Sequence, residues 1–168
     1  PDFLPFEYDI TTPFRAIGSL GFVIGKYGLV GVEYEYVDYS ASDVSPKDDQ
    51  FQSDFVDVNK TIQSKYAASH NFRIGGELRV DKLRFRIGGG MSGTPFASNV
   101  NTSDETDQSR ININGGIGFR DKNFYFDTGY SFTQWGAFNG VYAINNVPVG
   151  VTSKYRDHRL MFTFGWNF

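Results

Sequence analysis

Residues 160–168 read Leu-Met-Phe-Thr-Phe-Gly-Trp-Asn-Phe, and every second side chain along this stretch belongs to one of two sets. Successive side chains on a β-strand point to opposite faces, so the stretch predicts a strand with one wholly apolar face. That face consists of Leu160, Phe162, Phe164, Trp166 and Phe168. A strand of a soluble sandwich would turn such a face inward and end on a polar residue. Here the last residue, Phe168, lies on the apolar face.

This pattern resembles the closing strand of a bacterial outer-membrane β-barrel. In that class the terminal aromatic residue and the alternating apolar positions before it are recognised by the insertion machinery. We therefore expect the five apolar residues of 160–168 to form an insertion signal. A second interpretation is an edge or core strand of a soluble β-domain, and the remaining strands have to decide between the two.

Composition narrows the class of protein. The 168 residues include 17 Phe, 10 Tyr and 19 Gly, and no stretch has the ~20 consecutive apolar residues that a transmembrane helix needs. Cysteine is absent, which excludes disulfides and thiolate metal sites. The net charge is −3 and the basic residues are dispersed, so we expect no nucleic-acid partner. The chain opens at Pro1 without an initiator Met, and we expect it to be part of a longer protein.

Candidate chemistry is sparse. His70 and His158 stand in no metal-ligand spacing, and no Ser/His/Asp arrangement has a plausible register. We therefore expect no enzymatic activity, no catalytic residue, no cofactor and no metal site.

Alternation recurs along most of the chain and predicts a single all-β domain over residues 1–168. Residues 1–11 are interpreted as an irregular approach segment. Seven strands are expected at 12–25, 28–45, 70–80, 83–96, 108–120, 123–143 and 151–168. Tight turns alternate with longer loops, as in an antiparallel meander. In outer-membrane barrels the tight turns lie at the periplasmic rim, so this arrangement predicts a transmembrane barrel whose C-terminus lies at that rim.

The two faces of the predicted strands differ in kind. The apolar positions are free of charge in their central stretches, and a face that meets lipid should have this property. The opposite face is rich in glycine and charge, and we expect it to form a polar ladder in the lumen: Arg15, Glu33, Glu35, Arg73, Glu77, Arg79, Arg84, Arg86 and Asp127. A two-residue turn at Asp81-Lys82 would pair Glu77 with Arg86. The ladder either lines a solute path or holds the lumen shut.

Residues 50–66 follow a different period. Apolar side chains recur there at intervals of three and four residues, which predicts an amphipathic helix on an extracellular loop. Its apolar stripe is Phe51, Phe55, Val58, Ile62 and Tyr66. The helix could gate the barrel or bind a partner; alternatively, it packs its stripe onto the barrel rim.

Three motifs carry a family resemblance. They are Tyr8-Asp9-Ile10-Thr11-Thr12-Pro13-Phe14-Arg15, Gly31-Val32-Glu33-Tyr34-Glu35-Tyr36-Val37-Asp38-Tyr39, and Asn71-Phe72-Arg73-Ile74-Gly75-Gly76-Glu77 after the helical loop. Together they resemble the C-terminal half of FadL-type outer-membrane transporters of long-chain fatty acids and aromatic hydrocarbons, over about residues 6–168. The resemblance implies a porin-like barrel of fourteen strands with an N-terminal hatch. The seven strands here would then be half of that barrel.

The leading functional expectation is passive uptake of hydrophobic solutes across the outer membrane of a Gram-negative bacterium. The alternative is a plugged structural or assembly barrel within a larger outer-membrane complex. Expected partners are outer-membrane lipid, the missing N-terminal half of the barrel on the same or a separate chain, a hydrophobic small-molecule ligand and other complex subunits. A small barrel of eight strands, with residues 1–11 as the eighth, is a third option that Pro5 disfavours.

Overall fold

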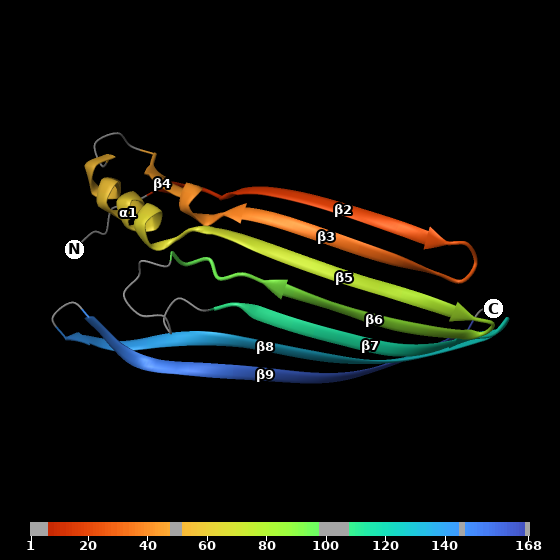
Figure 1. Ribbon diagram of the computed structural model, residues 1–168. Helices are drawn as coiled ribbons and strands as arrows, with labels where there is room; N and C mark the ends of the chain where they lie inside the picture. Colours follow the sequence, from red (N-terminus) through yellow and green to blue (C-terminus); the bar gives the residue numbers. More distant parts are fainter. Residues whose placement is uncertain (1–6, 48–51, 98–107, 145–146, 167–168) are drawn as a thin grey trace.

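A computed structural model describes residues 7–47, 52–97, 108–144 and 147–166. Its main element is a single sheet whose seven strands follow one another in chain order, each antiparallel to the next (Figure 1). The strands are β2 (Phe14–Ile24), β3 (Gly28–Asp38), β5 (Ala68–Val80), β6 (Leu83–Ser92), β7 (Arg110–Arg120), β8 (Phe124–Ile144) and β9 (Val147–Trp166). The predicted antiparallel meander of an all-β protein is therefore confirmed.

The prediction of one long strand over 28–45 is wrong. β3 ends at Asp38, whose carboxylate accepts hydrogen bonds from the Ser40 amide (3.2 Å) and the Ser40 hydroxyl (2.6 Å). These bonds replace the next ladder contact and start a short 3₁₀ turn, η1 (Tyr39–Ala41). Another strand, β4 (Asp43–Pro46), begins at the fifth residue after Asp38.

The interpretation of residues 1–11 as irregular is also wrong for its described part. β1 (Tyr8–Thr11) pairs antiparallel with β4 in a separate two-stranded sheet, with Ile10 opposite Val44. Because β1 joins β4 and lies outside the main sheet, it is not an eighth strand of that sheet.

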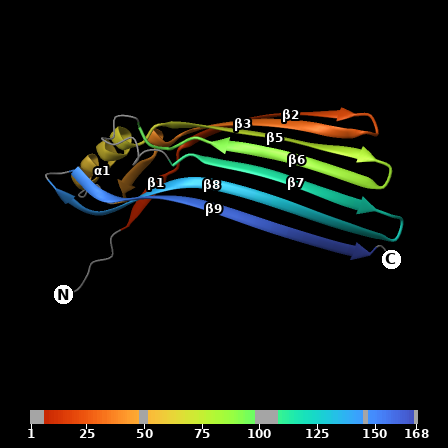
Figure 2. The same ribbon diagram turned by 60° about the horizontal axis from the view of Figure 1, so that its bottom comes forward.

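The predicted helix is present as α1 (Gln52–Lys65). It lies at the end of the sheet opposite the tight turns (Figures 1 and 2). The Asn59 side chain attaches it to β4, because its Oδ1 accepts from the Val44 amide (2.9 Å) and its Nδ2 donates to the Val44 carbonyl (2.8 Å). Both backbone groups of Val44 that face the helix are thereby satisfied.

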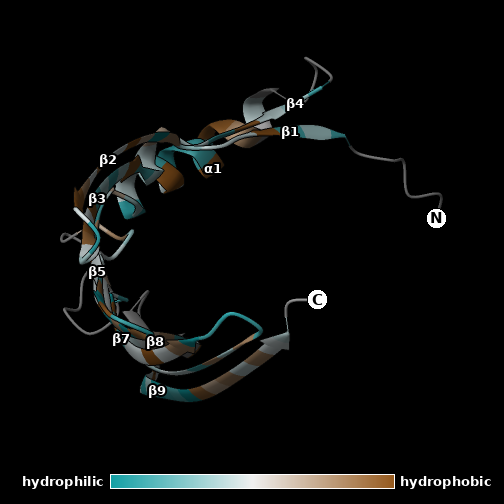
Figure 3. Cartoon of the chain, turned by 90° about the vertical axis from the view of Figure 1, so that its right-hand side faces the viewer, coloured by the Kyte–Doolittle hydropathy of each residue, from teal (hydrophilic) through white to brown (hydrophobic). Residues whose placement is uncertain are grey.

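The main sheet curves into an open arc when viewed along the strands (Figure 3). β2 and β9 form its two edges and run in the same direction, since five antiparallel strands separate them. Within the described ranges, neither edge strand has a second neighbour. The helix α1 lies on the concave side of the arc (Figure 3).

The apolar positions of the strands occupy the convex face. On β6, for example, Ile87 is 73% exposed, whereas its neighbour Arg86 is only partly exposed on the other face. Val37 is the one large apolar side chain in the described residues that is fully buried. Full burial of a Leu, Ile or Phe side chain is favourable by about 1.5–3 kcal/mol relative to exposure to water. Covering the convex face with an apolar environment would therefore be energetically favourable. No helix in the described ranges is long and apolar enough to cross a membrane.

Candidate functional site

The concave face carries a chain of ion pairs near the tight turns, here called the turn-end network: Glu77, Arg79, Arg86, Arg120 and Asp127. Glu77 accepts from Arg79 Nε (2.6 Å) and Arg86 Nε (2.7 Å). Asp127 accepts from Arg86 Nη1 (2.7 Å) and Arg120 Nη2 (2.6 Å). The chain of contacts therefore crosses four strands, from β5 to β8.

One glycine makes this crossing possible. Arg86 on β6 and Asp127 on β8 are separated by β7, and Gly118 lies beneath their contact. A Cβ atom on Gly118 would overlap Asp127 Oδ1 and approach Arg86 Nη1 to 3.3 Å. The missing side chain thus gives the two charged groups room to meet over the middle strand.

A second group of charges, the loop-end network, lies farther along the same face: Arg15, Glu33, Glu35, Asn71 and Arg73. Its centre is Glu35, which is 5% exposed. Glu35 accepts from Arg15 Nε (3.2 Å), Arg73 Nη2 (2.9 Å) and Asn71 Nδ2 (3.3 Å). Arg73 also pairs with Glu33. Three donors thus surround the buried Glu35 carboxylate and replace the hydrogen bonds that it would make with water.

All nine residues predicted for the polar ladder lie on the concave face, and the predicted pairing of Glu77 with Arg86 is present in the register. Eight of them belong to the two networks. Arg84 does not, because its Nη1 donates to the backbone carbonyls of Asp81 (2.8 Å) and Leu83 (2.9 Å). Asn71 and Arg120 are members that the sequence analysis did not select, although strand alternation places both on the polar face.

The concave face is not polar throughout. Near the edge strand β2 it exposes three aliphatic side chains: Ile17 (57% exposed), Val23 (78%) and Leu29 (39%). Val23 and Leu29 are register partners on β2 and β3. These three side chains, here called the apolar strip, lie beside the two charged networks on the same face, with Ser19 and Gly21 between Ile17 and Val23.

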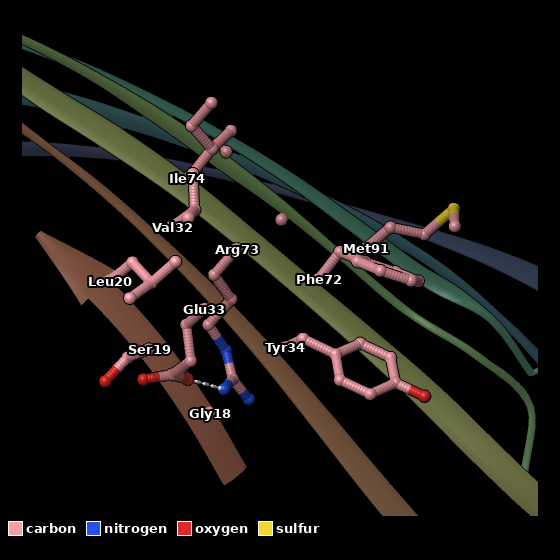
Figure 4. A pocket seen from close by; sticks show the side chains of 12 residues that line it. Gly18, Ser19, Leu20, Val32, Glu33, Tyr34, Phe72, Arg73, Ile74 and Met91 are labelled. Atoms are coloured by element: carbon pink, nitrogen blue, oxygen red, sulfur yellow. Dashed lines mark hydrogen bonds and ion pairs between the residues drawn. The ribbon is translucent and has the colours of Figure 1, made fainter.

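The convex face contains an apolar groove of about 710 Å³. It lies between two rows of side chains that cross the strands, one formed by Leu20, Val32 and Ile74 and the other by Tyr34, Phe72 and Met91 (Figure 4). Gly18 and Gly89 lack side chains at opposite ends of the rows, which leaves both ends of the groove open. The Arg73–Glu33 ion pair drawn in Figure 4 belongs to the opposite face of the same strands.

The residues predicted as an insertion signal share the convex face of β9. Leu160 and Phe162 are each 69% exposed, Phe164 is 52% exposed and Trp166 is 64% exposed, while Phe168 lies outside the described residues. The rings of Phe164 and Trp166 meet edge to face at 4.3 Å. They form an aromatic cluster at the tight-turn end of the sheet.

Two tyrosine–histidine pairs lie on the convex face toward the loop end. The Tyr34 hydroxyl and His70 Nδ1 share a hydrogen bond of 2.7 Å, and the Tyr130 hydroxyl and His158 Nδ1 share another of the same length. The sequence analysis noted both histidines without finding partners for them. No cluster of His, Cys, Asp and Glu able to hold a metal occurs in the part of the chain that is described.

The helical stripe is only partly used for packing. Phe55 and Ile62 are half-buried, and Tyr66, just past the helix, stacks on Phe96 at 5.2 Å. Val58 does not share this burial, since 45% of it is exposed, and Phe51 lies outside the described residues. The helix contacts β4 and η1, at the loop end of the sheet.

Comparison with models of protein families, with curated proteins and with solved structures finds no match to this chain. The two faces of the sheet and their side chains are therefore the basis for assigning a function.

Proposed function

We propose that the main sheet is part of a bacterial outer-membrane β-barrel, with its convex face in lipid and its concave face toward the lumen. The exposed aliphatic and aromatic side chains of the convex face support this placement. On β5, the convex residues from His70 to Val80 extend over ten residue steps, or ~33 Å of strand. Tilted by 35–45°, such a strand crosses the ~25 Å apolar band of an outer-membrane barrel.

The charged networks support the assignment of the lumen. On a lipid-facing surface an Arg side chain at the bilayer midplane would be unfavourable by ~2–4 kcal/mol, whereas on the concave face the arginines pair with carboxylates. The tight turns then face the periplasm, together with the C-terminal end of β9. The unpaired edges of β2 and β9 require further strands, which a fourteen-stranded barrel of the FadL type would supply.

We assign the complete barrel to passive uptake of hydrophobic solutes such as long-chain fatty acids. The observation that carries this assignment is the exposed apolar strip of Ile17, Val23 and Leu29 on the concave face. In a purely aqueous channel such side chains would be unfavourable neighbours of water. A hydrocarbon solute would find in them apolar contacts beside the charged networks.

The test is uptake of a radiolabelled long-chain fatty acid by outer-membrane vesicles that contain the protein. Val23→Glu places a charge on the apolar strip and should lower the uptake rate by roughly tenfold, equivalent to a barrier raised by about 1.4 kcal/mol. Ser131→Glu is the matched control, because Ser131 lies on the same face at a polar position of β8. Equal uptake by wild type, Val23→Glu and the control would refute the assigned path.

The second candidate is a plugged structural barrel. The mutual pairing of the ladder charges favours it, since such networks stiffen a wall without any solute. In that case the strip of Ile17, Val23 and Leu29 would pack against a protein plug. Val23→Glu would then weaken the folded barrel, and the wild type would transport no fatty acid at all.

A further inference from the structure

A small polar pocket lies on the convex face at the loop end of β7, β8 and β9. Its volume is about 330 Å³, and its convex-side lining includes Ser109, Gln134, Thr152 and Lys154. Strand register places Gln134 beside Arg156 and Gly136 beside Lys154. Hydroxyl, amide and ammonium groups therefore converge on a face that is otherwise apolar.

Among the described residues, this part of the convex face is basic and carries no neutralising acid. Lys154 and Arg156 are exposed, and no carboxylate of the described residues lies within ion-pair distance of either. The convex positions of β7, of β8 from Phe124 to Phe138 and of β9 from Thr152 to Trp166 contain neither Asp nor Glu. Arg156 Nε donates to Gln134 Oε1 at 3.2 Å, which places its guanidinium beside one of the residues that line the pocket.

On the concave face, by contrast, several arginines have carboxylate partners. Arg73 and Arg86 each pair with two carboxylates there. Because Lys154 and Arg156 have no such carboxylate partners among the described residues, the basic pocket has the charge expected of an anion-binding surface.

The depth of the pocket defines which anion it meets. Directly toward the centre of the sheet lie Phe132 and His158, followed by Tyr130 and Leu160, and from there to Trp166 the convex face of β9 is apolar. Aromatic rings with one polar end, such as Tyr130 hydrogen-bonded to His158, are enriched where hydrocarbon gives way to headgroups. The pocket thus lies about two residue rows, ~13 Å along the strand, beyond this boundary.

We propose that this pocket binds the phosphate of a lipid headgroup in the outer leaflet, with Lys154 and Arg156 as its cations. The lipid's acyl chains then lie on the hydrocarbon side of that boundary, along the apolar convex positions of β9 from Leu160 to Trp166. The inference rests on the proposed membrane placement. It goes beyond that placement because it assigns a binding site for a phosphorylated lipid headgroup to the loop end of β8 and β9.

The experiment uses the protein in phosphatidylcholine vesicles that contain a small fraction of diphosphoryl lipid A. The lipid A that remains bound after detergent extraction is counted per protein by native mass spectrometry. Lys154→Gln and Arg156→Gln should each lower the retained lipid by about fivefold, because one cation near a membrane surface strengthens the binding of an anionic lipid by about that factor. The double variant should lower it by about twenty-five-fold. Lys26→Gln, at the tight-turn end, is the matched control and should leave retention unchanged.

Two further measurements use the wild-type protein and therefore do not depend on the folding of the variants. Wild-type protein should retain far less lipid A after its phosphates are removed, and high salt should release the phosphorylated form because the site is exposed to solvent. Equal retention of the dephosphorylated lipid, or full retention by the double variant, would overturn the inference while leaving the membrane placement intact. Failure of the protein to enter vesicles of any composition would overturn both.

Discussion

Arg86 Nη1 on β6 and Asp127 Oδ1 on β8 form an ion pair of 2.7 Å although a complete strand lies between them. Neighbouring strands are ~4.8 Å apart, so the contact covers two strand spacings. It requires the inward curvature of the sheet, which brings concave side chains together, and it requires Gly118 beneath the contact. The contact therefore depends on the curvature of the sheet and on the absence of a side chain at Gly118.

Replacement of Gly118 by Ala should break this ion pair. The added methyl group would occupy the position of Asp127 Oδ1, and the displaced carboxylate would leave Arg86 and Arg120 without it. We expect the free energy of unfolding to fall by about 1–3 kcal/mol, the range for a partly buried charged group that loses its partner. Reversible unfolding of the barrel in lipid vesicles measures this change.

Gly115→Ala on the same strand is the control. A Cβ at Gly115 meets only the Arg86 carbonyl, at 3.9 Å, so this substitution should change stability by less than about 0.5 kcal/mol. Equal effects of the two substitutions would mean that glycine is needed on β7 for a reason unrelated to the ion pair.

Strand alternation was sufficient to predict the meander, its tight turns and the residues of each face. The turn at Asp81-Lys82 even determined the pairing of Glu77 with Arg86, because a two-residue loop leaves a single register. The pairing of β1 with β4 was missed because it joins segments more than thirty residues apart through hydrogen bonds of the backbone, which leave little trace in the side-chain pattern.

The candidate sites were predictable to a smaller degree. The contact between Arg86 and Asp127 depends on the absence of a side chain at Gly118, and alternation says nothing about space above a neighbouring strand. The pocket beside Lys154 combines three strands, and its charge became evident only once their convex positions were aligned.

A second prediction concerns pH and the two adjacent tight turns. Lys82 Nζ lies 2.9 Å from Asp121 Oδ1, and this hydrogen bond, aided by the Lys122 amide, lowers the pKa of the Asp121 carboxyl below its usual value. A depressed pKa in the folded state means that the contribution of Asp121 to stability is present above the unfolded value of about 3.9 and is lost as pH falls through the folded pKa. In an NMR titration of the Asp121 carboxyl carbon, Lys82→Gln should move the midpoint upward, and an unchanged midpoint would contradict the role of Lys82.

A third prediction compares neighbouring residues on β7. Ile113 lies on the convex face and Asn112 on the concave face. If the convex face meets lipid, Ile113→Arg should destabilise the folded protein by ~2–4 kcal/mol, the penalty for Arg at the bilayer midplane, and Asn112→Arg should be tolerated better. Unfolding in lipid vesicles gives both values. Equal tolerance would contradict lipid contact of the convex face, and better tolerance of Arg at Ile113 than at Asn112 would mean that the faces are reversed.

A fourth prediction concerns the edges of the sheet. β2 and β9 run in the same direction, so direct pairing would create a parallel seam, and a second copy in the same membrane orientation would do the same. An odd number of further strands makes both seams antiparallel, and we expect such strands to be present. Since this sequence contains no Cys, paired cysteines can test the seam.

The test places one cysteine at Leu20 and the other at Leu160, Phe162 or Phe164 in turn. None of these edge pairs should form a disulfide. The double variant Leu20→Cys and Val32→Cys is the positive control, because these two residues are register partners on β2 and β3 and should form one. Efficient cross-linking of any edge pair would show that the seven strands close on themselves.

The central claim is that lipid covers the convex face, and β9 tests it most directly. Nitroxide labels at successive positions from Leu160 to Phe164, in protein reconstituted into vesicles, report collisions with oxygen dissolved in the bilayer. The account predicts high oxygen collision rates at Leu160, Phe162 and Phe164 and low rates at Met161 and Thr163, a period of two residues. Uniform rates along the strand, or preferential contact of the even positions with a water-soluble relaxing agent, would contradict it.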